Sequence, residues 1–211
     1  MEKNQNNQNN PGIVDKAVLA VKNHKTPIII GVACVIALAA IIGGIKSYKE
    51  SKYQKLWGDF FLAQYEISKN ENKTDLAALE SFVNKNKTNA AGAQGLLMLG
   101  EYAWQNKDYE KAEGYYNQAA QVKEFRPIAK AAIIAAKLAQ NNYDEVIALA
   151  NDFAKHYGTH FAFTQVLLNK ALAFELSGKI DEAKEVYTQI IQQEPSGYNA
   201  IFAENKLRTL K

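Results

Sequence analysis

The chain has 211 residues, a net charge of +3 and a single cysteine, Cys34. From Lys46 to the end there are 21 Lys and Arg residues and 20 Asp and Glu residues, so this part lacks the basic excess of a nucleic-acid-binding protein. One cysteine excludes an intramolecular disulfide and a cysteine-ligated zinc site. Glycine and proline are few, at 12 and 4, which argues against a β-sandwich, whereas the abundant Ala, Lys, Leu, Glu and Gln favour helix.

Residues 1–26 are predicted to form a polar head. The opening stretch, MEKNQNNQNNPG, has nothing to bury and is predicted to be disordered. Residues 13–21 carry apolar side chains at helical spacing, which predicts a short amphipathic helix. This helix either leads into the next segment or lies on a membrane surface or a partner.

Residues 27–46 are predicted to form a transmembrane helix. The 18 residues from Ile28 to Ile45 are uncharged, which corresponds to roughly 27 Å of helix. A cleaved signal peptide fits poorly because 27 residues precede the run and no clean Ala-x-Ala site ends it. A lipoprotein signal at Cys34 fits poorly because the run continues well past it, and a core helix is rarely apolar on all faces.

The charges next to the predicted span leave its orientation open. Lysines lie close to both of its ends, at Lys16, Lys22 and Lys25 on one side and at Lys46, Lys49, Lys52 and Lys55 on the other. The positive-inside rule therefore does not place the C-terminal domain on either side of the membrane.

Residues 47–90 are predicted to form juxtamembrane helices. Apolar and aromatic residues recur at helical spacing from Tyr48 to Ile67, so this helix is expected to continue from the spanning segment. A second, short helix is predicted for residues 76–83, with Thr74 or Asp75 as its N-cap.

Residues 91–211 are predicted to form a repeat domain. Each of three segments has an apolar helix, a polar turn and a second amphipathic helix; the segments are 95–119, 131–153 and 167–190. The matching turn residues Tyr109 and Tyr143 are 34 residues apart, which is the tetratricopeptide period. Residues 198–210 are predicted to be the capping helix that covers the last apolar face of such a solenoid.

The side chains at matching positions suit close helix packing. Small residues are found where two helices are expected to approach closely, at Gly100, Ala112 and Ala183. An aromatic residue lies four positions after each alanine, on the same helix face: Tyr116 after Ala112, and Tyr187 after Ala183. Carboxylates that can cap the second helices are Asp108 and Asp181. Two prolines, Pro127 and Pro195, are predicted to follow the ends of second helices, because a helix usually stops before a proline.

These segments resemble tetratricopeptide repeats. The first and third units fit the family pattern, whereas the second departs from it, with Val146 where Ala is usual and Ile134 where a small residue is usual. The resemblance implies a tetratricopeptide-type solenoid, and together with the apolar run it predicts an all-α fold in which a single N-terminal transmembrane helix precedes this solenoid. An ordinary helical bundle is the alternative.

No catalytic constellation is visible in the sequence. There is no Gly-rich phosphate loop, no HExxH motif and no G-x-S-x-G motif. His156 and His160 are four residues apart and could bind a metal on a continuous helix. Gly158 lies between them, so ordinary loop histidines are favoured, and we expect no enzymatic activity, no metal and no cofactor.

The resemblance implies a concave groove lined by the first helix of each unit. The groove positions, carried over residue by residue, are Gln94, Leu97, Glu101, Trp104, Ile128, Ala131, Ala135, Leu138, Gln165, Leu168, Leu172 and Glu175. They include no cluster of Lys and Arg that would suit a carboxylate clamp. Trp104 and Leu97 are the candidate contact patch, with burial in the core as the alternative.

The whole layout also resembles a narrower family, the YfgM-like ancillary subunits of the bacterial Sec translocon. The similarity lies in the polar head, the single anchor, the segment SYKESKYQKLW after it, the Ala- and Gly-rich first repeat helix and the terminal segment NAIFAENKLRTL. It implies a single-pass inner-membrane protein with a periplasmic repeat domain. The implied partners are translocon subunits, periplasmic chaperones and exported clients.

Two other classes of function stay open. The same scaffold would serve in another envelope assembly, such as a pilus, division or outer-membrane complex. An enzyme or regulatory module that uses the repeats as a docking arm would need a second domain, for which no residues remain in this sequence.

Overall fold

The computed structural model describes the backbone of residues 25–69 and 76–210, and the side chains of residues 38–69 and 76–210. Contacts within the chain divide it into two units, Met1–Lys55 and Leu56–Lys211. Almost all of the predicted polar head, including its amphipathic stretch, lies outside the described residues.

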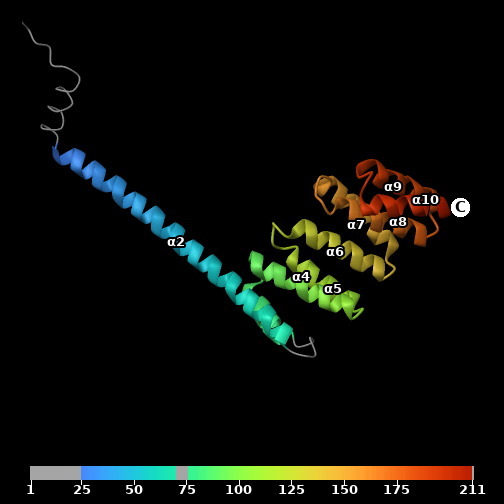
Figure 1. The fold of residues 1–211 in the computed structure, drawn as a ribbon, viewed down its shortest axis with the longest axis horizontal. Helices are drawn as coiled ribbons and strands as arrows, with labels where there is room; N and C mark the ends of the chain where they lie inside the picture. Colours follow the sequence, from blue (N-terminus) through green and yellow to red (C-terminus); the bar gives the residue numbers. More distant parts are fainter. Residues whose placement is uncertain (1–24, 70–75, 211) are drawn as a thin grey trace, which may run out of the picture. The chain divides into compact units, whose positions relative to one another are not determined.

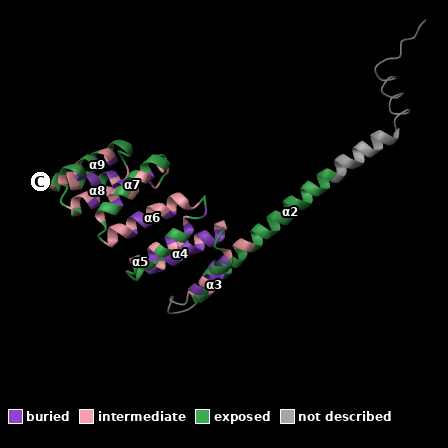
Figure 2. Ribbon diagram, turned by 180° about the vertical axis from the view of Figure 1, so that it is seen from behind, coloured by how far each residue is buried: buried purple, intermediate pink, exposed green. Residues whose placement is uncertain are grey.

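The described part of the first unit belongs to one helix, α2 (Lys25–Lys69), whose last residues lie in the second unit. This confirms the helix predicted after the apolar run, and every described side chain from residue 38 to residue 55 is exposed (Figure 2). Among the described residues, no helix is both long and apolar enough to cross a membrane. The side chains of residues 27–37 are not among those described, so the spanning segment stays a prediction.

The second unit begins with the end of α2, which packs on α3 (Ala77–Asn86). Phe60, Ala63 and Ile67 form one buried face of α2 and share a core cluster with α3 and the following helix. The residue before α3 is Leu76, which makes no capping hydrogen bond through its side chain. The prediction of Thr74 or Asp75 as N-cap is therefore wrong, because Leu76 packs against the cluster and the helix starts after it.

Three helical hairpins and a final helix follow, in the order seen in Figure 1. They are α4 (Ala90–Gln105) with α5 (Tyr109–Ala119), α6 (Arg126–Ala139) with α7 (Tyr143–Tyr157), α8 (Phe163–Leu176) with α9 (Ile180–Gln193), and α10 (Tyr198–Thr209). The described structure is all-helical, which confirms the predicted class, the three units and the C-terminal helix.

The turns inside the three hairpins share one backbone feature. Lys107, Asn141 and Gly178 have positive φ angles of 61°, 63° and 79°, and they occupy the same position in the three units. This left-handed residue ends the first helix and lets the chain reverse within a few residues. After the first turn, the Asp108 side chain accepts a hydrogen bond from the Lys111 amide at 3.1 Å, as predicted for this cap.

The predicted close approach at Gly100 is confirmed. A Cβ atom at this position would collide with the Tyr116 ring, so the absence of a side chain on α4 makes room for the aromatic ring of α5. Both residues are buried, and this pairing of the smallest side chain with a large one fixes how the two helices of the first unit pack.

The two prolines play different parts. Pro195 follows α9, which ends at Gln193, as predicted. Pro127 lies in the first turn of α6 and does not mark the end of α5, which already ends at Ala119. The prediction was wrong here because proline also suits the first turn of a helix, where its fixed φ is helical and its missing N–H costs nothing.

Candidate functional site

From the second unit onward, the first helices lie on the inner side of the solenoid. Helix α6 contacts α8, and α8 contacts α10, whereas no comparable contact joins α4 to α6, α5 to α7 or α7 to α9 among the described residues. A stack of hairpins is concave on the side where its helices are closest. We call the side chains predicted to line the groove on α4, α6 and α8 the inner surface.

On the first unit, the inner surface combines packed and accessible side chains. Gln94 and Leu97 are partly buried, and Glu101 is exposed. Trp104 is partly buried and its ring meets the Tyr109 ring edge-on, with centroids 5.0 Å apart. Trp104 therefore contributes to packing within its own hairpin and offers only part of its ring to a partner.

On the next two units, the predicted groove positions differ in accessibility. Gln165 is exposed, and Leu138 and Leu172 are partly buried. Leu168 is 7% exposed and belongs to the core of α6–α10, so it supports the groove from below. Leu176 was not predicted, yet it is 56% exposed and lies four residues after Leu172, on the same side of α8.

Glu175 joins three helices at the C-terminal end of the inner surface. It accepts hydrogen bonds from the Tyr187 hydroxyl of α9 at 2.7 Å and from the Lys206 ammonium of α10 at 2.7 Å. Burial raises the pKa of the Tyr187 hydroxyl, and the bond to Glu175 raises it further. The carboxylate thus has partners within the chain, and its main part is to hold α8, α9 and α10 together.

Asn169 is a buried polar side chain that the sequence analysis missed. It is 5% exposed, and its Oδ1 atom accepts a long bond of 3.5 Å from the amide of the exposed Gln165. Its Nδ2 atom has no hydrogen-bond partner in the described part of the chain. A buried donor without a partner is destabilising, and this one lies next to a groove residue. The only sequence signal was an asparagine, followed by Lys170, inside the otherwise apolar stretch VLLNKALAF.

The two histidines near the end of α7 do not share a helix face. Helix α7 ends at Tyr157, with Gly158 as its C-cap, as the sequence indicated. His156 contacts Asp152 through its Nδ1 atom, whereas the Nδ1 atom of His160 accepts a bond from the Ala162 amide. In the part of the chain that the structure describes, no three His, Cys, Asp or Glu side chains are placed to hold a metal.

Two segments of the chain match models of the tetratricopeptide repeat. The matched residues are 93–125 and 165–197, which correspond to the first and third hairpins. The chain therefore contains tetratricopeptide repeats, and repeats of this kind form scaffolds that bind other proteins. A sequence comparison with curated proteins gives no match.

Two solved structures with related folds are also tetratricopeptide domains. The Arabidopsis OM64 TPR domain is 19% identical, with a TM-score of 0.48, and the match covers 55% of this chain and 93% of that one. The first TPR of Spaghetti (RPAP3), bound to the HSP90 peptide SRMEEVD, is 18% identical, with a TM-score of 0.49, over 59% of this chain and 94% of that one. At this level of likeness neither structure says what this chain binds.

Proposed function

We propose that this chain is a non-catalytic scaffold whose inner surface binds an extended segment of a partner protein. The observation that carries the proposal is the accessible apolar pair on α8, the partly buried Leu172 and the 56% exposed Leu176, next to the buried Asn169, whose Nδ2 donor has no partner in the described part of the chain. If the Asn169 side chain turns outward when a partner binds, its amide can donate to a backbone carbonyl of the extended segment. The apolar side chains of Leu172 and Leu176 on the same helix would pack against the partner's side chains.

The apolar run from Ile28 to Ile45 supports a membrane anchor for this scaffold. In the proposed arrangement the protein crosses the bacterial inner membrane once, and the repeat domain stands on the periplasmic side. Anchoring next to a membrane complex raises the effective concentration of the inner surface there, so that weak contacts with a passing segment suffice.

The proposed partners are the Sec translocon at the anchor and exported proteins or periplasmic chaperones at the inner surface. This assignment rests on the resemblance of the whole layout to YfgM-like translocon subunits. A scaffold of another envelope complex is the alternative, and it would use the same surface with different neighbours.

The experiment places a photoreactive amino acid at three positions of the full chain in native membranes and identifies the adducts by mass spectrometry. Leu172 reports on the inner surface, and Ile42, at 65% exposure on α2, reports on the anchor. Glu185, an exposed residue of α9, is the matched control on the opposite side of the same unit. We expect translocon subunits at position 42 and exported proteins or chaperones at position 172, at several times the yield found at position 185.

Other adduct patterns have defined meanings. Adducts at position 172 from a different envelope complex would exclude the translocon and keep the scaffold. Cytosolic adducts would place the repeat domain on the other side of the membrane. Equal yields at positions 172 and 185 would contradict the assignment of the inner surface.

The substitution Asn169→Leu separates binding from stability. Leucine is similar in size and leaves no buried donor without a partner, so we expect the free energy of unfolding to be unchanged or raised by about 1 kcal/mol. Partner capture at position 172 should fall several-fold because the donor is lost. Denaturant unfolding and crosslinking yield, measured on the same variant, check both parts. If the free energy of unfolding falls while the crosslinking yield at position 172 is unchanged, Asn169 contributes to folding and not to partner binding.

A further inference from the structure

The middle hairpin carries charges where its neighbours are apolar. In α6, Lys130 and Lys137 occupy positions that lie 34 residues after Leu96 and Ala103 and 37 residues before Leu167 and Phe174. In the first and third hairpins these positions contribute to the apolar packing of the repeat. Two ammonium groups cannot be buried in the same way without partners, so at these positions α6 presents ion-paired lysines in place of apolar side chains.

A cleft of about 500 Å³ lies between α5, α6 and α7, and both lysines line it. Ile133, Ile134 and Leu149 give it apolar lining, and charged side chains of all three helices surround them. This volume is within the range of ordinary ligand sites, which likewise combine an apolar lining with a few placed polar groups.

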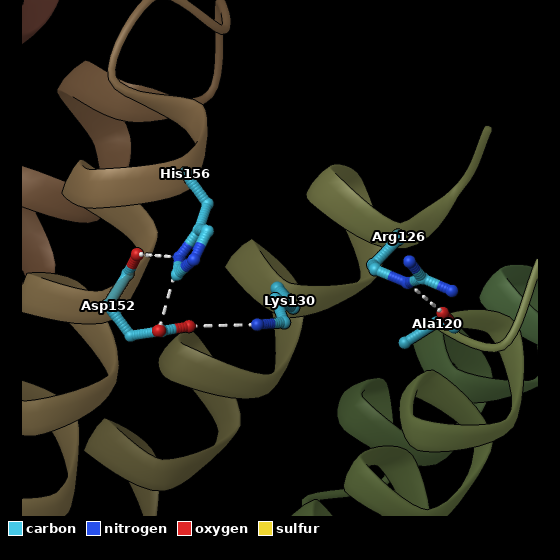
Figure 3. A network of polar contacts seen from close by, with 5 residues as sticks. All are labelled: Ala120, Arg126, Lys130, Asp152 and His156. Carbon is cyan, nitrogen blue, oxygen red and sulfur yellow. Dashed lines mark hydrogen bonds and ion pairs between the residues drawn. The ribbon is translucent and has the colours of Figure 1, made fainter. Parts of the chain in front are cut away.

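The two lysines are already paired with carboxylates. The Lys137 ammonium lies 3.0 Å from Glu113 and 3.1 Å from Glu145, and its hydrogen bond to Glu113 is the main cause that raises its pKa. The Lys130 ammonium lies 2.8 Å from Asp152, as Figure 3 shows, and this bond lowers the pKa of that carboxyl. Neither lysine therefore attracts an added anion strongly.

Arg126 differs from these two lysines. Its Nε atom donates to the Ala120 carbonyl at 3.0 Å, which holds the side chain across the loop between α5 and α6 (Figure 3). Its two terminal nitrogens make no hydrogen bond or ion pair in the described part of the chain. A guanidinium that is anchored by Nε and keeps its terminal N–H groups is arranged to bind a carboxylate through them.

We propose that this cleft is a second protein-binding site, which takes a glutamate or aspartate side chain of a partner together with a neighbouring apolar side chain. The carboxylate pairs with the terminal nitrogens of Arg126, and the apolar side chain packs on Ile133 and Leu149. Glu145 and Asp152, with side chains 51% and 42% exposed, line the same cleft, and they disfavour a doubly charged phosphate or other polyanion more than a singly charged carboxylate. The site therefore suits a single carboxylate, and it is separate from the inner surface.

The test uses the full chain in neutral detergent and two probes, acetyl-Leu-Glu-Leu-amide and its glutamine counterpart. Isothermal titration calorimetry should give at least tenfold tighter binding of the glutamate peptide, since only it can pair with the guanidinium. The preference should shrink as the salt concentration rises. Arg126→Gln should abolish it, and Arg126→Lys should keep part of it because the charge remains. Arg208→Gln on the exposed side of α10 is the matched control and should leave it unchanged.

A further variant covers the case in which Arg126→Gln loosens the α5–α6 loop. Asn117→Trp replaces an exposed residue at the rim of the cleft and should block both peptides while Arg126 stays in place. Equal affinities for the two peptides, a preference that survives Arg126→Gln, or unchanged binding by Asn117→Trp would overturn the proposal. None of these outcomes bears on Leu172, so a failure here is distinguishable from a failure of the inner surface.

Discussion

Replacing Tyr187 with alanine should lower the free energy of unfolding of the C-terminal core by about 3–5 kcal/mol. The side chain is fully buried among α6–α10, so its loss leaves a cavity the size of an aromatic ring. It also removes the hydroxyl that donates to Glu175, the residue that links α8 and α9 to α10. Urea unfolding followed by far-UV circular dichroism measures the change.

The conservative variant separates the ring from the hydroxyl. Tyr187→Phe keeps the packing and loses only the hydrogen bond to a charged group, so it should cost about 1.5–3 kcal/mol. Thr188→Ala on the exposed side of α9 is the control and should cost little. Because a repeat array is stabilised by contacts between neighbours, hydrogen exchange should speed up in α8–α10 before α3–α5. A loss below about 1 kcal/mol for Tyr187→Ala would contradict the part assigned to this ring.

The repeat architecture could be predicted because its signals are local and recur. The spacing of Tyr109 and Tyr143 and the polar turns between apolar stretches follow from the geometry of a helical hairpin. Small and aromatic residues at matching offsets reflect direct contact, as at Gly100 and Tyr116. The helices and turn of each hairpin lie close to where the local sequence pattern predicts them. The three units and the final helix could therefore be found without information on long-range contacts.

The details of the candidate sites could not be predicted, because they depend on partners far away in the sequence. Glu175 was assigned to the groove, yet it bonds to Lys206 on a helix 31 residues later. Leu168 shares the helical face of exposed groove residues and is still covered by its neighbours. The bond that positions Arg126 runs to a backbone carbonyl of the preceding loop, which no residue pattern reveals.

The departures of the middle unit from the repeat pattern affect both the cleft and the buried core. Helix α6 differs from the other first helices in two ways. It has charged residues at the cleft, Lys130 and Lys137, and it has a large side chain in the core, Ile134, where a small residue is usual. The apolar core must then be kept filled by a different distribution of side chains. The middle unit thus keeps its place in the stack while its other side carries the charged cleft that we propose as a binding site.

This redistribution predicts a strong coupling between Ile134 and Ala150. Both are 1% exposed, and they occupy the positions that hold Ala171 and Tyr187 in the third unit. The large side chain has moved from the second helix to the first. Ile134→Ala alone should cost about 2–5 kcal/mol by leaving a cavity, and Ala150→Tyr alone should cost about 3 kcal/mol by overpacking.

The double variant restores the size pattern of the third unit, so its cost should be less than the sum of the two single costs by about 2–3 kcal/mol. Urea unfolding of the four proteins in the cycle measures this coupling. The control pairs Ala150→Tyr with Leu99→Ala, a core residue of a separate cluster, and these two costs should add. Additive costs for Ile134 and Ala150 would mean that the two side chains do not share one space, and the middle hairpin would then pack in a way that the repeat pattern does not describe.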